Sequence, residues 1–439
     1  MARVLMTSAY NSLETWPGRL FEAVDPTITL TNPTRFVWTH PGDGDFPNFE
    51  VRIDGTGFTY NEDDGSPSGG TITSIKVFDG ATLILTIDQF SGSGISRDLA
   101  QIASDMFGWR FGDDGAGPDG KMAWSHMLQG NDTIIGTSGD DRQIEGFMDG
   151  NDLFNMKAGD DYIYAGAGKD TVNGGAGFDT LTYNRTAFNE GFSAFRGISV
   201  NMVNKTVIDC WGMIDKFTGI EAVHGSRFND KFVGSAADDE FAGLRGRDIL
   251  NGGAGRDGAI YYDDEFYGGR LGITVNLETS FLKGVAKGFA IDGFGQRDTL
   301  ISMEDIFATN FDDSLTGSRF SNRIQGRDGN DTMTGGGGQD QFYWRKQDTL
   351  GDDDTVTDFV ATGAGRDTLE FRTEFFNNMS TTLTLVNGTA ANEPVGTFIF
   401  DATDDTLYWD EDGTGGIAKI KVVTLTNVGL LSAANFDLF

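Results

Sequence analysis

An aspartate recurs about every nine residues in three blocks of this chain, most often two places after a glycine. A period this short cannot be a globular domain repeat, because it supplies only one turn and one short strand. The pattern predicts a coil whose stacked repeats bury a shared core. The repeating positions are Asp132, Asp141, Asp152, Asp161, Asp170 and Asp179, then Asp230, Asp239, Asp248 and Asp257, then Asp313, Asn322, Asp331 and Asp340.

The repeat that ends in Thr182 shows how one unit is built. It reads Gly174-Gly175-Ala176-Gly177-Phe178-Asp179-Thr180-Leu181-Thr182. The glycines allow positive φ, so the first six residues predict a tight turn, and the last three predict a strand with one inward apolar residue. The inward residues are Phe154, Ile163, Val172, Leu181, Phe232, Phe241, Leu250, Leu315, Ile324, Met333 and Phe342.

Two repeats would complete one coil, so turns 18 residues apart are expected to stack on the same edge. The facing pairs would be Asp152/Asp170, Asp161/Asp179, Asp230/Asp248, Asp239/Asp257 and Asp313/Asp331. Carboxylate and carbonyl oxygens on a flexible frame suit Ca²⁺ better than Mg²⁺ or Zn²⁺. The spacing therefore predicts calcium sites along both edges.

The motif Gly-Gly-x-Gly-x-Asp-x-apolar-x resembles the nonapeptide of the RTX (repeats-in-toxin) family of secreted calcium-binding proteins. The resemblance implies a parallel β-roll, with the repeat aspartates and Asn322 as metal ligands and about eight Ca²⁺ ions, one per facing pair of turns. It also implies that backbone carbonyls of the turn glycines complete the sites. These glycines are Gly166, Gly168, Gly175, Gly177, Gly246, Gly253, Gly255, Gly329, Gly336 and Gly338.

Several turns depart from the motif. Asn322 replaces an aspartate, so its site is expected to be weaker. Phe228, Phe311 and Phe320 stand where a glycine is expected, and the turn before Asp239 lacks the paired glycines. An 11-residue step before Asp152 predicts a bulge.

Composition limits the partners of the chain. With 33 basic and 66 acidic residues, the net charge is −33, which repels nucleic acid and anionic membranes. A hydrophobic content of 38% is enough for a folded core. A solvated Gly/Asp linker is the alternative, but it would not need an apolar residue two places after nearly every aspartate.

We expect an all-β chain in which a calcium-bound parallel β-roll in three blocks is joined by hairpin insertions. The roll would be flanked by an N-terminal β-rich domain with one helix near Leu99–Phe107 and by a C-terminal β-sandwich, the latter implied by the resemblance. The expected segments are 1–125 (N-terminal domain), 126–183, 226–259 and 309–345 (roll blocks), 184–225 and 260–308 (insertions), and 346–439 (C-terminal sandwich and secretion signal).

Export is predicted without a Sec signal, because the first residues contain no apolar stretch of suitable length. The RTX resemblance implies type I secretion, and Leu430–Phe439 resembles its C-terminal signal; a hydrophobic terminal strand is the alternative, and both can hold. The sequence contains no apolar run of 18 residues, so no transmembrane segment is predicted. The single cysteine, Cys210, excludes an intramolecular disulfide and is expected to be a buried small side chain.

No enzyme is predicted. The three histidines, His40, His126 and His224, form no His-Glu-x-x-His motif, and neither a Gly-x-Ser-x-Gly elbow nor a phosphate loop occurs. The turn Asp410–Gly415 is open to two interpretations, a calcium ligand or an ordinary hairpin turn.

These observations favour a secreted calcium-binding structural protein of the bacterial cell surface or extracellular matrix, resembling a surface layer. Its expected partners are calcium, the type I secretion machinery, and either further copies of itself or a cell-surface polysaccharide. An RTX adhesin or glycan-binding protein is the alternative, and an unrecognised secreted hydrolase is a third.

Overall fold

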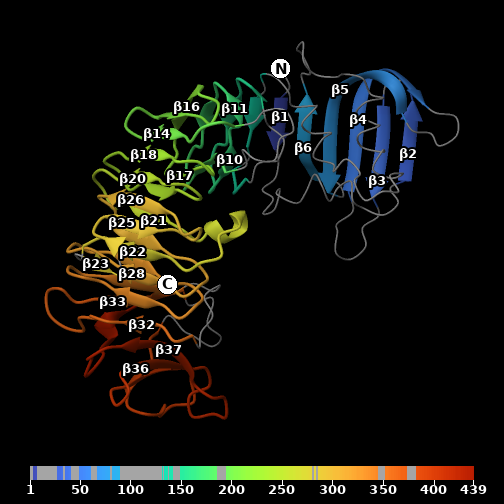
Figure 1. The fold of residues 1–439 in the computed structure, drawn as a ribbon. Coiled ribbons are helices and arrows are strands. Elements are labelled where there is room, and N and C mark those ends of the chain that lie inside the picture. The colour runs from blue at the N-terminus through green and yellow to red at the C-terminus, as the bar shows by residue number, and fades with distance from the viewer. Residues whose placement is uncertain are drawn as a thin grey trace. The chain divides into compact units, whose positions relative to one another are not determined.

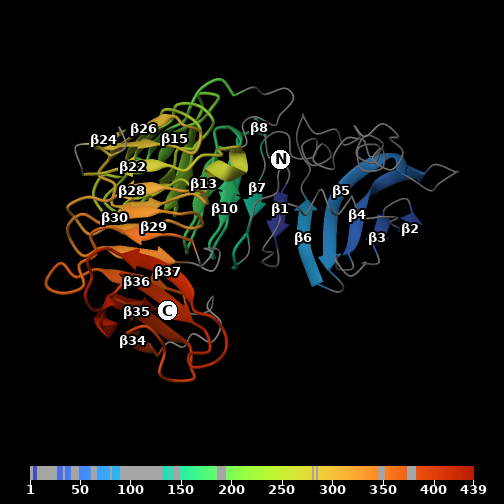
Figure 2. The ribbon, with the colours of Figure 1, turned by 60° about the horizontal axis from the view of Figure 1, so that its bottom comes forward.

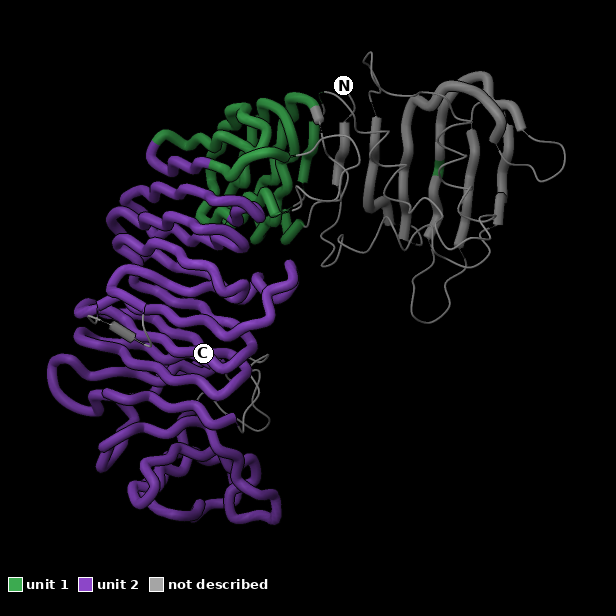
Figure 3. Tube along the Cα trace, viewed as in Figure 1, with its two compact units in different colours: residues 1–198, 204–223 green, residues 199–203, 224–439 purple. Residues whose placement is uncertain are grey.

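A computed structural model describes residues 3–6, 27–32, 35–40, 49–60, 67–79, 82–88, 131, 133–136, 138–141, 149–184, 194–278, 281–282, 285–344, 352–372 and 382–439. The chain divides into two compact units, residues 1–198 with 204–223 and residues 199–203 with 224–439 (Figure 3). In the described residues every regular element is a strand, apart from the short 3₁₀ helices η2 (Asp264–Tyr267) and η4 (Ala433–Asn435). The all-β prediction is therefore confirmed for this part of the chain.

Six N-terminal strands pair antiparallel in the order β2-β3-β4-β5-β6-β1, and β1 also pairs in parallel with β7 (Figure 1). Strand β4 runs without a break from Phe49 to Tyr60. The predicted helix near Leu99–Phe107 lies outside the described residues. The strands are β1 (Arg3–Met6), β2 (Thr27–Asn32), β3 (Arg35–His40), β4 (Phe49–Tyr60), β5 (Pro67–Asp79), β6 (Thr82–Asp88) and β7 (Thr133–Ile135).

The first unit contains the start of a roll built from two parallel sheets. One sheet joins β7, β9, β12 and β16, and the other joins β10 and β13. Successive short strands alternate between the sheets, as the nine-residue period predicts. The strands after β7 are β8 (Asp149–Gly150), β9 (Leu153–Asn155), β10 (Tyr162–Tyr164), β11 (Ala167–Gly168), β12 (Thr171–Asn173), β13 (Thr180–Thr182), β15 (Thr206–Ile208) and β16 (Ile214–Thr218), with β17 (Ala222–His224) at the boundary of the unit.

The second unit repeats this plan over a longer stack. One sheet contains β14, β18, β20, β26, β25, β22, β28, β30 and β32, in which β25 is antiparallel to its neighbours β26 and β22 and the other pairs are parallel. The other sheet runs β19-β21-β27-β29-β31-β33-β38, with every pair parallel. Figure 2 shows β22, β28 and β30 stacked one after another. The strands are β14 (Ser199–Asn201), β18 (Lys231–Val233), β19 (Glu240–Ala242), β20 (Ile249–Asn251), β21 (Gly258–Ile260), β22 (Thr274–Asn276), β23 (Phe281–Leu282), β24 (Val285–Ala286), β25 (Phe289–Ile291), β26 (Arg297–Ile301), β27 (Asp305–Phe307), β28 (Ser314–Thr316), β29 (Arg323–Gln325), β30 (Thr332–Thr334), β31 (Gln341–Trp344), β32 (Thr355–Val356) and β33 (Thr368–Phe371).

The insertions are hairpins that remain part of the roll. In the first, β15 pairs antiparallel with β16, and β16 continues the parallel stack beside β12. In the second, β25 pairs antiparallel with β26, and β26 lies parallel to β20. Each insertion therefore supplies a strand that takes the place of a repeat strand in the sheet.

The core lies between the two sheets of each unit and contains the predicted inward residues. Phe232 and Phe241 come from opposite sheets, and their ring centroids are 5.0 Å apart. Fully burying such a side chain stabilises the fold by about 1.5–3 kcal/mol. All eleven predicted positions are 0–1% exposed: Phe154, Ile163, Val172, Leu181, Phe232, Phe241, Leu250, Leu315, Ile324, Met333 and Phe342.

The C-terminal strands extend the sheets of the second unit. Strand β37 pairs in parallel with β32, and the terminal strand β38 pairs in parallel with β33. The expected hydrophobic terminal strand is therefore confirmed, whereas the secretion signal in the same residues stays a prediction. The strands are β34 (Leu385–Asn387), β35 (Thr397–Asp401), β36 (Thr406–Asp410), β37 (Ile420–Leu425) and β38 (Phe436–Leu438).

Candidate metal centre

At several glycines, the turns of the roll stack so closely that a side chain would not fit. A Cβ placed on Gly175 would lie 2.1 Å from the carbonyl oxygen of Lys157, and one on Gly336 would lie 2.1 Å from the carbonyl oxygen of Ser318. Both glycines have positive φ, of 122° and 95°. Carbonyl oxygens of one turn therefore lie against the next turn of the same edge, where they can contribute to a shared site.

The repeat aspartates form a hydrogen-bonded ladder along each edge. The backbone N–H of Asp230 donates to Oδ1 of Asp248 at 2.7 Å, 18 residues later, as the spacing predicts. The same bond joins Asp152 to Asp170, Asp161 to Asp179, Asp239 to Asp257, Asp313 to Asp331 and Asn322 to Asp340, at 2.8–2.9 Å. Asp141 reaches Asp161 over 20 residues, across the irregular step.

The ladder side chains are almost completely removed from solvent. Each one that the structure describes is at most 3% exposed: Asp141, Asp152, Asp161, Asp170, Asp179, Asp230, Asp239, Asp248, Asp257, Asp313, Asn322, Asp331 and Asp340. Asp132 lies outside the described residues. A buried carboxylate is costly unless each oxygen finds a donor or a cation.

One oxygen of many ladder carboxylates lacks such a donor. In the described part of the chain, the buried Oδ2 atoms of six repeat aspartates have no hydrogen-bond partner: Asp161, Asp170, Asp179, Asp248, Asp257 and Asp331. Their Oδ1 atoms accept the ladder bonds. A row of half-satisfied carboxylates is the arrangement that a bound cation would complete.

The raised pKa values of buried ladder carboxylates also favour a nearby positive charge. Burial, followed by the negative charge of Asp215, raises the pKa of Asp170 to about 9. Burial, followed by repulsion from Asp313 and Asp354, raises the pKa of Asp331 to about 9. Without a cation these groups hold protons near neutral pH, so Ca²⁺ and protons would compete for them.

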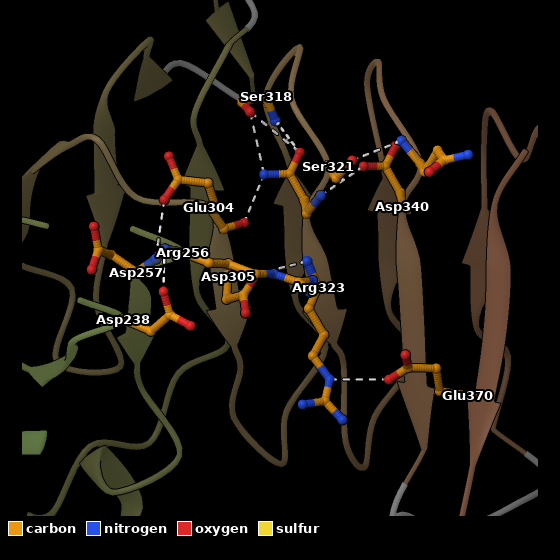
Figure 4. Close-up of polar contacts among 12 residues, drawn as sticks. Asp238, Arg256, Asp257, Glu304, Asp305, Ser318, Ser321, Arg323, Asp340 and Glu370 are labelled. Atoms are coloured by element: carbon orange, nitrogen blue, oxygen red, sulfur yellow. Dashed lines mark hydrogen bonds and ion pairs between the residues drawn. The ribbon is translucent and has the colours of Figure 1, made fainter. Parts of the chain in front are cut away.

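The ladder continues through acidic residues that the nonapeptide pattern did not identify as ligands. Asp170 donates its N–H to Asp215 and Asp179 donates its N–H to Glu221, both in the first insertion, at 2.9 Å. In the second insertion, Asp298 accepts the N–H of Asp248 at 2.9 Å. Glu304 accepts the N–H of Asp257 at 3.0 Å (Figure 4). After the third block, Asp354 and Asp367 accept the N–H groups of Asp331 and Asp340.

A signal for the insertion residues was present in the sequence. Residues 219–221 match 302–304 at a separation of 83 residues, and this match aligns Glu221 with Glu304. The same separation aligns Asp215 with Asp298. Reading the longer repeat as part of the ladder would have identified all four.

The donor set fits a hard oxygen-seeking cation. In the described residues, no three His, Cys, Asp or Glu side chains cluster closely enough to hold a metal by themselves. Backbone carbonyls would therefore have to contribute, as they do for Ca²⁺, which accepts six to eight oxygen ligands. Calcium would supply the charge that the buried carboxylates lack.

The residues that favour softer metals serve other purposes. Cys210 is buried and forms no disulfide. His224 is buried, and its Nδ1 lies 2.8 Å from Oδ2 of Asp263, as expected of a structural histidine.

In the turn Asp410–Gly415, the Gly413 N–H donates to Asp410 at 2.9 Å between the antiparallel strands β36 and β37, which is hairpin geometry.

Comparisons with known proteins agree with the repeat assignment. The model of the RTX calcium-binding nonapeptide repeat matches residues 128–142, 148–181, 224–259 and 307–342. A search of curated proteins found no match. Among solved structures, the extracellular lipase LipA from Serratia marcescens is 18% identical, with a TM-score of 0.18, over 71% of this chain and 38% of the lipase chain.

The likeness to the lipase carries no argument, because its TM-score is so low. The repeat match rests instead on the residues that build the ladder and its glycine turns. The chain therefore carries RTX calcium-binding nonapeptide repeats, in four copies.

Proposed function

We propose that this chain is a secreted, non-enzymatic protein that folds when it binds calcium and then builds or coats a bacterial cell surface or extracellular matrix. The observation that carries the proposal is the row of buried carboxylates with unpartnered oxygens along the roll. Without a cation, their mutual repulsion and the entropy of the glycine-rich turns oppose folding. Calcium binding would thus supply much of the folding free energy.

Calcium-dependent folding would suit a secreted protein. Proteins with RTX repeats are typically secreted. Extracellular calcium modules bind with dissociation constants of about 10⁻⁴–10⁻³ M, so low cytosolic calcium would leave the chain unfolded and exportable. In the part of the chain that the structure describes, no helix is long and apolar enough to cross a bilayer.

An adhesin or glycan-binding role is the second candidate. The antiparallel array of β2 to β6 favours it, since these strands would bind the glycan while the roll served as a spacer. Light scattering on calcium addition separates the two. Ordered sheets or filaments support the surface-layer proposal, and a monomer that binds polysaccharide supports the adhesin.

Catalysis is tested on the same sample. Turnover of lipid, peptide or glycoside substrates by the calcium-loaded chain would contradict the non-enzymatic proposal. We expect none, because no catalytic motif was found in the sequence.

A further inference from the structure

The turns that precede the ladder residues adopt two conformations. In one kind, the residue four places before the aspartate has positive φ, even where it is not glycine: Lys157 at 77°, Leu244 at 62° and Arg327 at 74°. Such residues are rarely left-handed, and each costs about 1–2 kcal/mol in this conformation. We call turns of this kind left-handed turns. They precede Asp161, Asp170, Asp179, Asp248, Asp257, Asp331 and Asp340.

In the second kind, a serine or threonine stands at the same place, and its φ is not positive. Its backbone N–H donates to the ladder side chain: Ser226 to Asp230, Ser235 to Asp239, Thr309 to Asp313 and Ser318 to Asn322, at 2.6–2.8 Å. Its hydroxyl accepts the N–H two residues later, from Phe228, Ala237, Phe311 and Phe320, at 3.0–3.2 Å. We call these Ser/Thr turns.

The Ser/Thr turns explain the departures from the motif. A phenylalanine or alanine replaces the usual glycine because the hydroxyl, and not a left-handed residue, closes the turn. Each of these turns opens a roll block. Asp230 and Asp239 are the first ladder residues of the second block, and Asp313 and Asn322 are the first of the third.

The kind of turn that precedes a repeat aspartate is related to whether its Oδ2 has a hydrogen-bond partner. The six repeat aspartates named above for their unpartnered Oδ2, Asp161, Asp170, Asp179, Asp248, Asp257 and Asp331, each follow a left-handed turn. After the Ser/Thr turns, the N–H at that place occupies the carboxylate instead, for example Oδ2 of Asp239 at 2.6 Å. A cation and an N–H donor compete for the same oxygen, so the two kinds of turn differ in their need for metal.

Protein donors also close the far end of two ladders. Oδ2 of Asp215 accepts the hydroxyl of Tyr183 at 2.7 Å. Oδ2 of Asp367 accepts the N–H of Val360 at 2.7 Å. At these two ends, Oδ2 of the last carboxylate has a protein donor in the place of a cation.

Asn322 provides a natural test of this distinction. Its Oδ1 accepts the Ser318 N–H at 2.8 Å, and its Nδ2 donates to the Glu304 carbonyl at 2.7 Å. Figure 4 shows Glu304, Ser318 and Asp340 around this turn. An uncharged amide thus takes the ladder position while remaining fully buried, and its N–H group points at a carbonyl that would otherwise suit a cation.

We infer that the Ser/Thr turns are metal-independent caps of the roll, and that calcium is required only at the left-handed turns. Each cap would hold the first turn of a block in place before calcium arrives, so that binding extends an existing edge. The inference rests on the proposed calcium-driven folding. It assigns Asp257 as an essential calcium ligand, whereas Asp239 and Asn322 are structural residues of the same edge.

The experiment compares matched substitutions in the full-length chain. Asp257→Asn and Asp239→Asn lie on one edge, 18 residues apart, and change the same atoms. Bound calcium per chain is measured by equilibrium dialysis and atomic emission, and the calcium midpoint by circular dichroism. Asp257→Asn should bind fewer ions and raise the midpoint about tenfold. Asp239→Asn should keep the ion count, with a midpoint within about twofold.

A third variant avoids any loss of folding. Asn322→Asp restores the nonapeptide residue and should add no calcium ion, because the Ser318 N–H already occupies that oxygen. A higher ion count in Asn322→Asp, or a lower one in Asp239→Asn, would overturn the inference even if Asp257→Asn failed to fold. If the unsubstituted chain neither bound calcium nor folded with it, the proposed function itself would fail.

Discussion

Asp248 and Asp298 are 50 residues apart in sequence, yet the N–H of Asp248 donates to Oδ1 of Asp298 at 2.9 Å. Asp248 is a nonapeptide residue, whereas Asp298 belongs to a hairpin insertion. Both are at most 1% exposed, and burial raises the pKa of each above its ordinary value. The insertion therefore serves as one coil of the metal-binding edge.

Asp298→Asn tests this role of the insertion. The amide keeps the size of the side chain but removes a buried charge beside Asp248, so calcium binding should weaken. We expect the calcium midpoint of folding to rise about tenfold. Glu393→Gln is the control, because Glu393 is exposed and away from the ladder. Equal midpoints for the two variants would mean that the insertion only connects the blocks.

The close approach of two turns predicts a requirement for glycine at Gly336. Gly336→Ala would place a Cβ 2.1 Å from a carbonyl oxygen at a φ of 95°, so stability should fall by at least about 1–3 kcal/mol. Gly416→Ala is the matched control, since no atom lies within 4 Å of its added Cβ. Urea unfolding in saturating calcium measures both. Similar midpoints for the two variants would contradict the stacked geometry.

The core makes an independent prediction. Phe241 is completely buried against Phe232, so Phe241→Ala should destabilise the calcium-loaded chain by about 3–5 kcal/mol. Phe266 is 78% exposed, and Phe266→Ala should have little effect. Thermal unfolding at fixed calcium compares the two. A small effect at Phe241 would show that the sheets do not enclose a packed core.

The raised carboxylate pKa values predict opposite effects of pH with and without calcium. Burial, opposed by the Asn322 backbone N–H and aided by Asp367, raises the pKa of Asp340 to about 7; that of Asp331 rises to about 9. A raised folded-state pKa stabilises the protonated form. This contribution is complete below the unfolded-state value and is lost as pH rises through about 7 to 9.

In EDTA, strand content should therefore be greater near pH 5 than near pH 9. The calcium midpoint should fall as pH rises, because calcium displaces protons from the carboxylates. Circular dichroism at several pH values follows both effects. A calcium midpoint that does not depend on pH between about 5 and 9 would contradict the idea that calcium binds these buried groups.

The sequence predicted the parts of the fold that local chemistry determines. The nine-residue period specified the strand positions, the inward residues such as Phe154 and Ile163, and the pairing of turns 18 residues apart. Each depends only on the period of the chain and on the size of glycine.

The ladder residues that the nonapeptide pattern did not identify depend on long-range contacts. Asp215 and Asp298 reach the ladder through hairpins, so their contribution depends on β16 and β26 joining the sheet and not on any nine-residue motif. The departures at Phe228 and Phe311 were visible in the sequence, but their cause was not. It lies in the hydroxyls of Ser226 and Thr309, which accept the N–H groups of Phe228 and Phe311, and only the folded turn reveals these bonds.

The central claim is that calcium folds the roll, and a calcium titration of the EDTA-stripped chain tests it most directly. Far-UV circular dichroism should show a cooperative change from coil to strand, with a midpoint of about 10⁻⁴–10⁻³ M calcium. Magnesium at the same concentrations should not reproduce the transition. A chain that is already folded in EDTA at neutral pH, with a spectrum unchanged by calcium, would contradict the account.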